Sequence, residues 1–300
     1  MITIVGSINL DLIAKVDRLP GPGETLRSGG FTTAPGGKGA NQALAAARAG
    51  GAVRMIGAVG KDGFATEALA CLKEGKVDLS GVREAAAATG IALIFVDAKG
   101  ENVIVVAPGA NDTVLPGDLA RAHFAKGEIV LLQHEIPLAT VEEAIKAIAA
   151  AGGTSVLNTA PFRADAVKLL PMADYVVANE TEFDLYADVL KLEGGDRAAR
   201  MANFASKTGH TVIVTLGAEG VIAATPEGEI ALPSLKITPV DTVGAGDTFC
   251  GYFGAGLDAG MSLEDALRRA AVAGALACLK SGAQPAIPHA KEVDEALAGA

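Results

Sequence analysis

The sequence of 300 residues contains no tryptophan, only three cysteines and only 4% aromatic residues. The cysteines, Cys71, Cys250 and Cys278, lie far apart and stand beside small or apolar residues. This distribution argues against a disulfide framework and indicates buried free thiols in a reducing compartment. The four histidines, at positions 123, 134, 210 and 289, have no metal-ligand spacing, so no zinc site is predicted.

Positive charge is also scarce: 25 Lys and Arg stand against 35 Asp and Glu, a formal net charge of −10. Surfaces that bind nucleic acid or anionic membranes need clustered basic residues, so we expect neither partner, and any anionic ligand must be held locally. No uncharged stretch reaches the roughly 18 residues of a membrane helix, and residues 1–10 contain no basic leader. The sequence therefore predicts a soluble, cytoplasmic protein.

The sequence does contain a long alternation of apolar strands and helices. Half of the residues are hydrophobic, enough for one large core, and we expect a single domain over residues 1–300. Strands separated by single helices pair in parallel, so the pattern predicts an α/β fold, a doubly wound and mostly parallel sheet flanked by helices. The expected strands are 1–7, 53–59, 128–133, 154–158, 174–177 and 211–216 with a hairpin at 221–232, and the expected helices are 41–49, 64–74, 116–125, 138–151, 163–170, 181–188, 195–208, 246–259, 262–281 and 291–298.

Two stretches interrupt this alternation. Residues 12–35 consist of short β-leaning pieces around LPGPGE without a helical period, and residues 89–107 contain two β runs around DAKGE. Together they predict a small β-sheet apart from the main one.

Polar residues follow the predicted strands at the points where open parallel sheets bind ligands. Asn9 and Asp11 also fit a local turn after the first strand, and Glu135 also fits a surface charge. The set consists of Asn9, Asp11, Glu135, Asn158, Asn179, Glu182, Thr215 and Gly217.

The glycine-rich stretch GGKGANQ, residues 36–42, is not a P-loop, because Gly39 follows Lys38 where Ser or Thr is required and the upstream glycine is missing. Its glycines allow backbone N–H groups to approach a ligand closely. Asn41 fits two roles, bonding of ligand hydroxyls and capping of the following helix.

A second glycine-rich stretch, VDTVGAGDTF at residues 240–249, leads into a helix. Gly244, Ala245 and Gly246 would leave the first-turn N–H groups free, so a phosphate can bind there without a lysine. Asp247 fits a dipole-favoured helix-start residue, and it also fits a proton acceptor for a hydroxyl that attacks the phosphate.

Six motifs in order resemble those of the ribokinase-like (phosphofructokinase-B type) carbohydrate kinases. The resemblance runs from about residue 2 to 290 and implies the fold of that family, with the small sheet at about 12–35 and 89–107 as a lid. GGKGANQA, Glu135 in QHEIP and the segment GAQPAIP are most similar to the members that phosphorylate D-ribose at its 5-hydroxyl. The six motifs are GSINLDL at 6–12, PGETL at 22–26, GGKGANQ at 36–42, NETE at 179–182, TLGAEG at 215–220 and DTVGAGDTF at 241–249.

The resemblance assigns a role to each matching position, with ATP as the donor and Mg²⁺ as its metal. Asp247 is the implied catalytic base, beside the anion hole of Gly244, Ala245 and Gly246. Mg²⁺ and phosphate would be organised through water by Asn179 and Glu182. The implied sugar-binding residues are Asn9, Asp11, Gly37, Lys38, Asn41 and Glu135, and the implied nucleotide-binding residues are Thr215, Gly217 and Gly220.

The resemblance further implies activation by potassium. The cation would lie beside the anion hole, at Asp241, Val243, Gly282 and Ala286, mostly bound by backbone oxygens. The family commonly has Ser at the position of Ala286, so one side-chain ligand is missing here. The lid of this family also often pairs subunits, which implies a homodimer.

Other functions stay open from the sequence. The acceptor is alternatively deoxyribose, fructose, a keto-deoxy sugar acid or a nucleoside; a sugar acid needs a cation for its carboxylate, and a nucleoside needs aromatic residues, which are few here. A noncatalytic sugar or nucleotide sensor is disfavoured by the presence of Asp247. A dinucleotide-dependent oxidoreductase lacks its G-x-G-x-x-G turn after the first strand.

Overall fold

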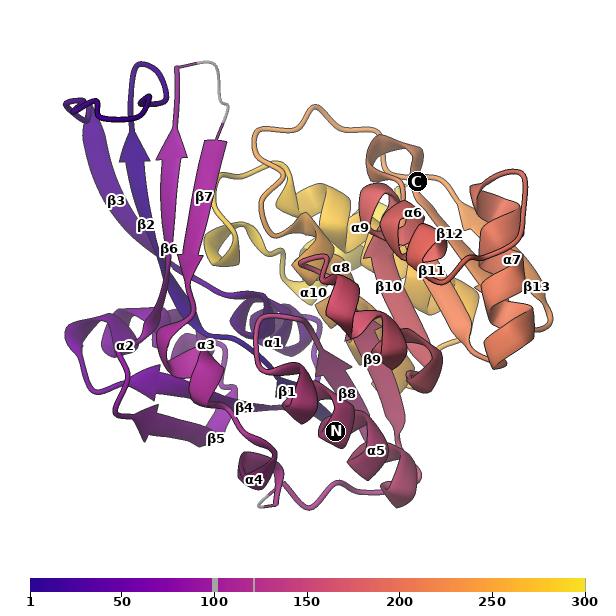
Figure 1. Cartoon of the computed structure of the whole chain (residues 1–300). Coiled ribbons are helices and arrows are strands. Elements are labelled where there is room, and N and C mark those ends of the chain that lie inside the picture. The colour runs from indigo at the N-terminus through magenta and orange to yellow at the C-terminus, as the bar shows by residue number, and fades with distance from the viewer. Residues whose placement is uncertain (99–101, 121, 300) are drawn as a thin grey trace.

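A large sheet flanked by helices dominates the computed structural model, which describes residues 1–98, 102–120 and 122–299 (Figure 1). The sheet has nine strands, of which β12 and β13 are antiparallel to their neighbours and the others are parallel. In spatial order they are β13 (Gly228–Leu232), β12 (Val221–Thr225), β11 (Thr211–Thr215), β10 (Tyr175–Asn179), β9 (Thr154–Asn158), β8 (Ile129–Leu132), β1 (Ile2–Val5), β4 (Val53–Gly60) and β5 (Asp78–Ala85).

The chain winds outward from β1 in both directions, first to β4 and β5 and then to β8 and onward. The sheet is therefore doubly wound, and the predicted fold class is confirmed. The direction of winding changes between β1 and β8, and the carboxyl ends of strands at such a switch point form the usual ligand crevice of open α/β sheets.

Helices cover both faces because the parallel strands are apolar on both sides. Ile4 and Leu131 belong to one core layer, whereas their chain neighbours Val5 and Leu132 belong to the other. The first layer contains α1 (Lys38–Arg48), α2 (Gly63–Ala68), α3 (Ala70–Glu74), α8 (Ala245–Asp258), α9 (Leu263–Ala277) and α10 (Ala290–Ala298). The second contains η1 (Gly109–Thr113), α4 (Pro116–Leu119), α5 (Leu138–Ala151), η2 (Ala164–Met172), α6 (Glu180–Val189) and α7 (Arg197–Thr208).

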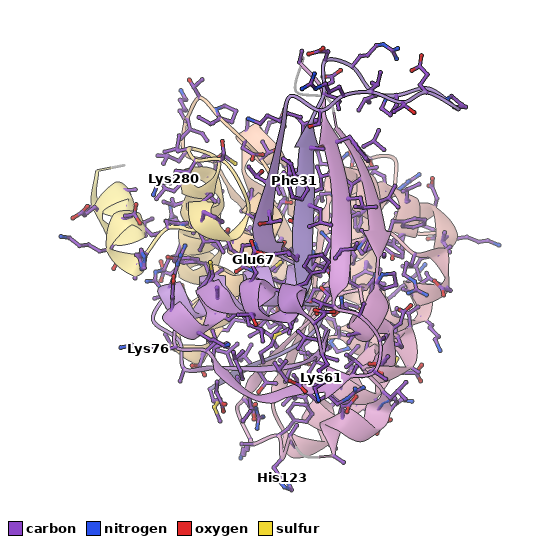
Figure 2. All side chains as sticks on the ribbon, turned by 90° about the vertical axis from the view of Figure 1, so that its left-hand side faces the viewer. Phe31, Lys61, Glu67, Lys76, His123 and Lys280 are labelled. Carbon is purple, nitrogen blue, oxygen red and sulfur yellow. The ribbon has the colours of Figure 1, made fainter. Side chains whose placement is uncertain are left out.

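A separate four-stranded sheet stands away from the main body, as the small-sheet prediction required (Figure 1). Its order is β3 (Gly30–Gly36), β2 (Asn9–Lys15), β6 (Gly90–Val96) and β7 (Asn102–Ala107). The hydroxyl of Thr33 on β3 donates to Glu67 of α2, which ties the sheet to the main body. Figure 2 labels Glu67 below the small sheet. The sheet begins at Asn9 instead of residue 12, and part of the predicted turn, residues 99–101, lies outside the described residues.

Several sequence predictions of local structure are wrong. Strand β5 was not expected, because it is an edge strand whose polar sequence DLSGVREA is only half-buried. The helix expected at 64–74 is divided at Leu69 into α2 and α3, and the helix expected at 116–125 is the short α4. The helix expected at 163–170 is the 3₁₀ helix η2, which contains Pro171.

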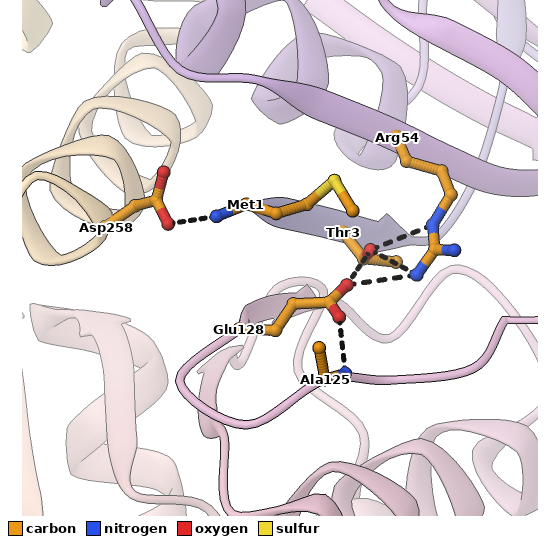
Figure 3. A network of polar contacts seen from close by, with 6 residues as sticks. All are labelled: Met1, Thr3, Arg54, Ala125, Glu128 and Asp258. Carbon is orange, nitrogen blue, oxygen red and sulfur yellow. Dashed lines mark hydrogen bonds and ion pairs between the residues drawn. The ribbon is translucent and has the colours of Figure 1, made fainter.

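The amino-terminal edge of the main sheet contains a buried polar network (Figure 3). Glu128, immediately before β8, accepts hydrogen bonds from the Thr3 hydroxyl, from Arg54 at 3.0 Å and from the Ala125 N–H at 2.8 Å. The amino group of Met1 pairs with Asp258 nearby. This edge is thus closed by matched partners, at the opposite end of the strands from the switch-point crevice.

Candidate active site

The start of α8 forms the centre of the candidate site. Gly244 is the N-cap residue with φ of 77°, a left-handed conformation that favours glycine, and an added Cβ would lie 2.9 Å from the Cβ of Ala283. Within the described ranges no acceptor is present for the N–H groups of Gly244, Gly246 and Asp247, whereas the N–H of Ala245 donates to the Thr242 carbonyl at 3.3 Å. The helix start therefore offers unpaired donors to an anion.

Asp247 is buried in the first turn of α8 and is held by two side-chain amides. Asn41 Nδ2 donates to Oδ2 at 2.9 Å, and Gln42 Nε2 donates to Oδ1 at 3.1 Å. Asn41 lies inside α1, whose N-cap is Gly37, so the alternative that Asn41 caps this helix is wrong. The Oδ1 atom of Asn41 is buried without a partner, which leaves it available to a ligand.

Glu135, after β8, is joined to the glycine-rich stretch. Its Oε2 accepts hydrogen bonds from the Ser7 hydroxyl at 2.6 Å and from the Lys38 N–H at 3.1 Å. Glu135 is therefore a tethered, half-buried side chain and not a free surface charge. Gly37 immediately precedes Lys38, so the contact also fixes this glycine beside the carboxylate.

Asn9 and Asp11 lie in β2 of the small sheet, so their alternative interpretation as turn residues is wrong. Asn9 is buried, and its Oδ1 accepts a hydrogen bond from Asn111 Nδ2 at 2.7 Å. Asn111 also pairs with the N–H and the carbonyl of Ile8. Asn111 was not predicted as a site residue, and the only sequence signal was its place in the short motif GAND after β7.

Acidic groups converge on this crevice and perturb one another. Burial, together with the negative charges of Glu135 and Asp247, raises the pKa of Asp11 to about 7. Burial of Lys38 alone would lower its pKa, but the nearby carboxylates, Asp247 above all, outweigh this and raise it. Lys38 therefore stays charged and places a cation among the carboxylates of this crevice.

Two cavities meet at the start of α8. A cavity of about 220 Å³ is lined by Lys38, Asn158, Asn179, Glu182 and Asp247 among others. A second cavity of about 340 Å³ has a largely apolar wall that includes the predicted residues Thr215, Gly217 and Gly220. Thr215, Thr242 and Gly246 line both cavities, so the two lie side by side. Thr242 was not predicted, although it lies inside the quoted motif.

Asn179 and Glu182 form a capping box at the start of α6. Asn179 Oδ1 accepts from the Glu182 N–H at 2.8 Å, and Glu182 Oε2 accepts from the Asn179 N–H at 3.2 Å. Both residues line the smaller cavity together with Asp247. Carboxylate and amide oxygens are ligands that Mg²⁺ accepts together with water and phosphate. In the ranges that the structure describes, no three His, Cys, Asp or Glu side chains could hold a metal ion by themselves.

The four predicted cation-site residues come from two segments that Asp241 joins. Its Oδ1 accepts from the Val243 N–H at 3.0 Å, and its Oδ2 accepts from the Gly282 N–H at 2.8 Å. Ala286 lies at the end of η4 (Gln284–Ala286) and is fully buried. The two segments also touch where Gly244 packs against Ala283, so this region lies directly behind the start of α8.

The chain resembles three known proteins over nearly its whole length. Residues 1–290 match the pfkB family of carbohydrate kinases. A ribokinase of Lactococcus lactis is 39% identical over 300 residues, covering 99% of this chain and 96% of that protein. A ribokinase structure from Thermotoga maritima has a TM-score of 0.91 at 31% identity over 99% of both chains. The ribokinase of Arabidopsis thaliana, solved with ribose and ATP, has a TM-score of 0.86 at 30% identity, covering 99% of this chain and 98% of that one.

Proposed function

This chain belongs to the pfkB family of carbohydrate kinases, and we propose that it transfers the γ-phosphoryl group of ATP to the 5-hydroxyl of D-ribose. The observation that carries the proposal is the position of Asp247. Its carboxylate lies between the sugar-side residues and the cavity at the start of α8, and unpaired helix N–H groups stand beside it.

In the proposed reaction the 5-hydroxyl oxygen attacks the γ-phosphorus in line, and its proton passes to the Asp247 carboxylate. The new bond joins that oxygen to phosphorus, the bond to the β–γ bridging oxygen breaks, and ADP leaves. The N–H groups of Gly244 and Gly246 stabilise the charge that develops on the transferred phosphoryl group. The Ala245 N–H joins them once it leaves its long contact with Thr242.

The sugar hydroxyls would be bound on the side of the small sheet. Asn9 and Asp11 approach from β2, Asn41 from α1 and Glu135 from the end of β8, so hydroxyls can donate to carboxylates and accept from amides. We assign Lys38 and Gly37 to the same site. The four-stranded sheet acts as the lid over the sugar, which excludes water from the transfer.

The larger cavity would hold the nucleotide, beside Thr215, Gly217 and Gly220. Asn179 and Glu182 line the cavity where the phosphates would lie, and Mg²⁺ held there would neutralise phosphate charge. Potassium would bind at Asp241, Val243, Gly282 and Ala286, behind the anion hole. Both ions are part of the proposal. The side-chain oxygens of Asn179 and Glu182 support the Mg²⁺ site, and the Asp241 carboxylate with nearby backbone carbonyl oxygens supports the potassium site.

A homodimer would form through the lid. Its outer surface exposes large apolar side chains that water does not favour, and Figure 2 shows one of them, Phe31. Of the β7 side chains, those of Val103, Ile104, Val105 and Val106 are exposed as well.

No helix in the described part of the chain combines the length and the apolar character that crossing a bilayer requires. We place the protein in the cytoplasm, in keeping with its three unpaired cysteines.

The test is an assay of ADP release over a panel of D-ribose, deoxyribose, fructose, a keto-deoxy sugar acid and a nucleoside, with potassium or sodium. The proposal predicts the highest kcat/KM for D-ribose and a product phosphorylated at the 5-position. A higher kcat/KM for another acceptor would replace the substrate assignment, and binding without turnover of any of them would support a sensor.

A further inference from the structure

Three buried amides lie beneath Asp247, and one of them, Gln42, contacts its carboxylate directly. Gln42 and Gln133 are fully buried, and Asn158 is nearly so. Gln133 Nε2 donates to Gln42 Oε1 at 2.7 Å, and Gln42 Nε2 donates in turn to Asp247 Oδ1 at 3.1 Å and to Asn158 Oδ1 at 3.4 Å. Gln42 comes from α1, Gln133 follows β8 and Asn158 ends β9, so the hydrogen bonds of Gln42 join three elements beside the carboxylate that Gln42 contacts.

The direction of this chain of hydrogen bonds follows from the charge of Asp247. An ionised carboxylate only accepts hydrogen bonds, so Gln42 must turn its Nε2 toward it. Gln42 Oε1 then points away from Asp247 and needs a donor, which Gln133 supplies. A protonated Asp247 would have a hydrogen to donate and would allow Gln42 to turn over. The observed arrangement therefore presents a donor to Asp247 Oδ1, the arrangement that suits a proton acceptor.

Gln133 contains a buried polar atom that lowers the stability of the folded state. Its Oε1 is buried without a hydrogen-bond partner, and such an atom loses the water that would solvate it in the unfolded chain. The space for this atom depends on Gly6, because a Cβ at that position would lie 2.0 Å from Gln133 Oε1. An apolar side chain of equal length would fill the same place without the unpaired atom. The glutamine is thus better explained by its donor than by stability.

We propose that Gln42 and Gln133 are positioning residues that act as an amide relay, fixing the orientation of the Asp247 carboxylate through neutral donors. This inference rests on the proposed role of Asp247 as the base. Neutral donors hold the carboxylate in place and leave its full charge available to the hydroxyl proton. A cation in the position of Gln42 would hold it equally well but would oppose proton uptake.

The charged and titratable groups that face Asp247 come from all the elements around it. Asp11 lies on β2, Lys38 on α1 and Glu135 after β8, while Glu182 lies on α6 and Cys250 on α8. Lys38 and Glu135 contact each other through the Lys38 N–H. A substitution of Gln42 or Gln133 leaves all of these titratable side chains in the protein. A change in the pH dependence of turnover therefore reports on the relay.

The experiment measures kcat against pH at saturating D-ribose and ATP for Gln42→Met and Gln133→Met. We expect Gln42→Met to lower kcat about tenfold and Gln133→Met about threefold, within the range that one hydrogen bond to a charged group controls. The acidic limb of both profiles should move to higher pH, because the ionised carboxylate loses a donor or its orientation. The KM for D-ribose should change less than twofold. Urea unfolding should show both variants to be less stable than the parent, because Gln133→Met leaves Gln42 Oε1 buried without its donor and Gln42→Met removes the same hydrogen bond.

A matched control removes a buried hydrogen bond far from the site. Thr140 on α5 is fully buried and donates to the Val114 carbonyl at 2.7 Å. Thr140→Val should lower stability and leave the pH profile unchanged. Profiles of both glutamine variants that superimpose on the parent after scaling would overturn the relay, as would a raised KM with unchanged kcat.

A double-variant cycle separates this inference from the proposed function. If Asp247 is the base, adding Gln42→Met to Asp247→Asn should lower kcat no further, since the relay has no carboxylate to orient. Full additivity of the two effects would overturn the relay and leave the base in place. Near-normal turnover of Asp247→Asn alone would instead contradict the proposed function.

Discussion

Glu128 and Asp247 are both buried carboxylates, but Glu128 lies at the amino ends of the parallel strands and Asp247 at their carboxyl ends, and the two have different partners. Glu128 is matched by the guanidinium of Arg54, the Thr3 hydroxyl and a backbone N–H (Figure 3). Asp247 is matched by the neutral amides of Asn41 and Gln42 and lines a cavity. A buried carboxylate that is paired with a cation contributes to stability. A carboxylate that neutral amides hold beside a cavity can accept a proton from a ligand, as proposed for Asp247.

The largest expected effect is on turnover at the carboxyl edge. Asp247→Asn keeps the shape of the side chain but removes the proton acceptor, so kcat should fall by at least about 10²-fold. Calorimetric binding of D-ribose should weaken less than threefold, and urea unfolding should show no loss of stability. If Asp247→Asn unfolds at a lower urea concentration than the parent, Asp247 contributes to stability as Glu128 does, and the proposed difference between the two carboxylates is wrong.

The corresponding change at the amino edge should act on stability alone. Glu128→Ala removes the acceptor of the Thr3 hydroxyl and leaves Arg54 without its paired carboxylate, with Thr3 Oγ1 as its remaining acceptor. Breaking a buried ion pair in this way costs about 3 kcal/mol of unfolding free energy. Urea denaturation gives this value directly. Below the transition, kcat and the KM for D-ribose should equal those of the parent, and a tenfold loss of kcat would show that the two edges are coupled.

A third carboxylate, Asp11, should make sugar binding depend on pH. Its pKa of about 7 means that it is largely protonated below pH 7, while sugar hydroxyls need the ionised form as an acceptor. The dissociation constant of D-ribose should therefore rise about tenfold between pH 8 and pH 6. Calorimetry in two buffers of different ionisation enthalpy should detect proton release near pH 7, and Asp11→Asn should abolish it.

The raised pKa of Asp11 also makes folding stability depend on pH, and stability falls as the pH rises whereas sugar binding strengthens. The folded state binds this proton more tightly than the unfolded chain, so the contribution of Asp11 to stability falls as the pH rises from about 4 to about 7. Asp11→Asn should then raise the unfolding temperature at pH 8 and change it little at pH 4. An equal change at both values would contradict the role of burial.

The smallest effect is expected at the proposed potassium site. Asp241 is a carboxylate whose present partners are the N–H groups of Val243 and Gly282, an arrangement between those of Glu128 and Asp247. Ala286→Ser adds one hydroxyl oxygen to the oxygen ligands proposed there and should lower the potassium concentration for half-maximal activity by about threefold. The half-maximal concentration is measured by following kcat as KCl is added at constant ionic strength. If kcat of neither protein responds to KCl, the proposed potassium site is wrong.

The fold was predictable wherever burial on both faces made the pattern strong. Residues 138–151 and 154–158 were placed correctly because long apolar runs end at clear boundaries. Edge strand β5 was missed, since a half-exposed strand has no such pattern. Asn9 and Asp11 were placed after a strand instead of inside β2, because the pairing of β2 with β3 and β6 depends on contacts distant in the sequence.

The candidate site was predictable where a residue stands in a recognisable motif. Asp247 and Asn41 are in contact, although 206 positions separate them. Gln42 stood in the quoted motif GGKGANQ, yet its role depends on its contact with Asp247 and on Gln133 from another strand end. Asn111 acts through Asn9 and Ile8, and no local spacing shows such a contact.

A single-turnover comparison of Asp247→Asn and Glu128→Ala by rapid quench tests the central claim most directly. With D-ribose saturating and enzyme in excess over radiolabelled ATP, the amplitude and rate report phosphoryl transfer itself, apart from product release. We predict that transfer slows at least about 10²-fold in Asp247→Asn and is unchanged in folded Glu128→Ala. Equal transfer rates in the two variants would contradict the assignment of chemistry to one edge of the sheet and stability to the other.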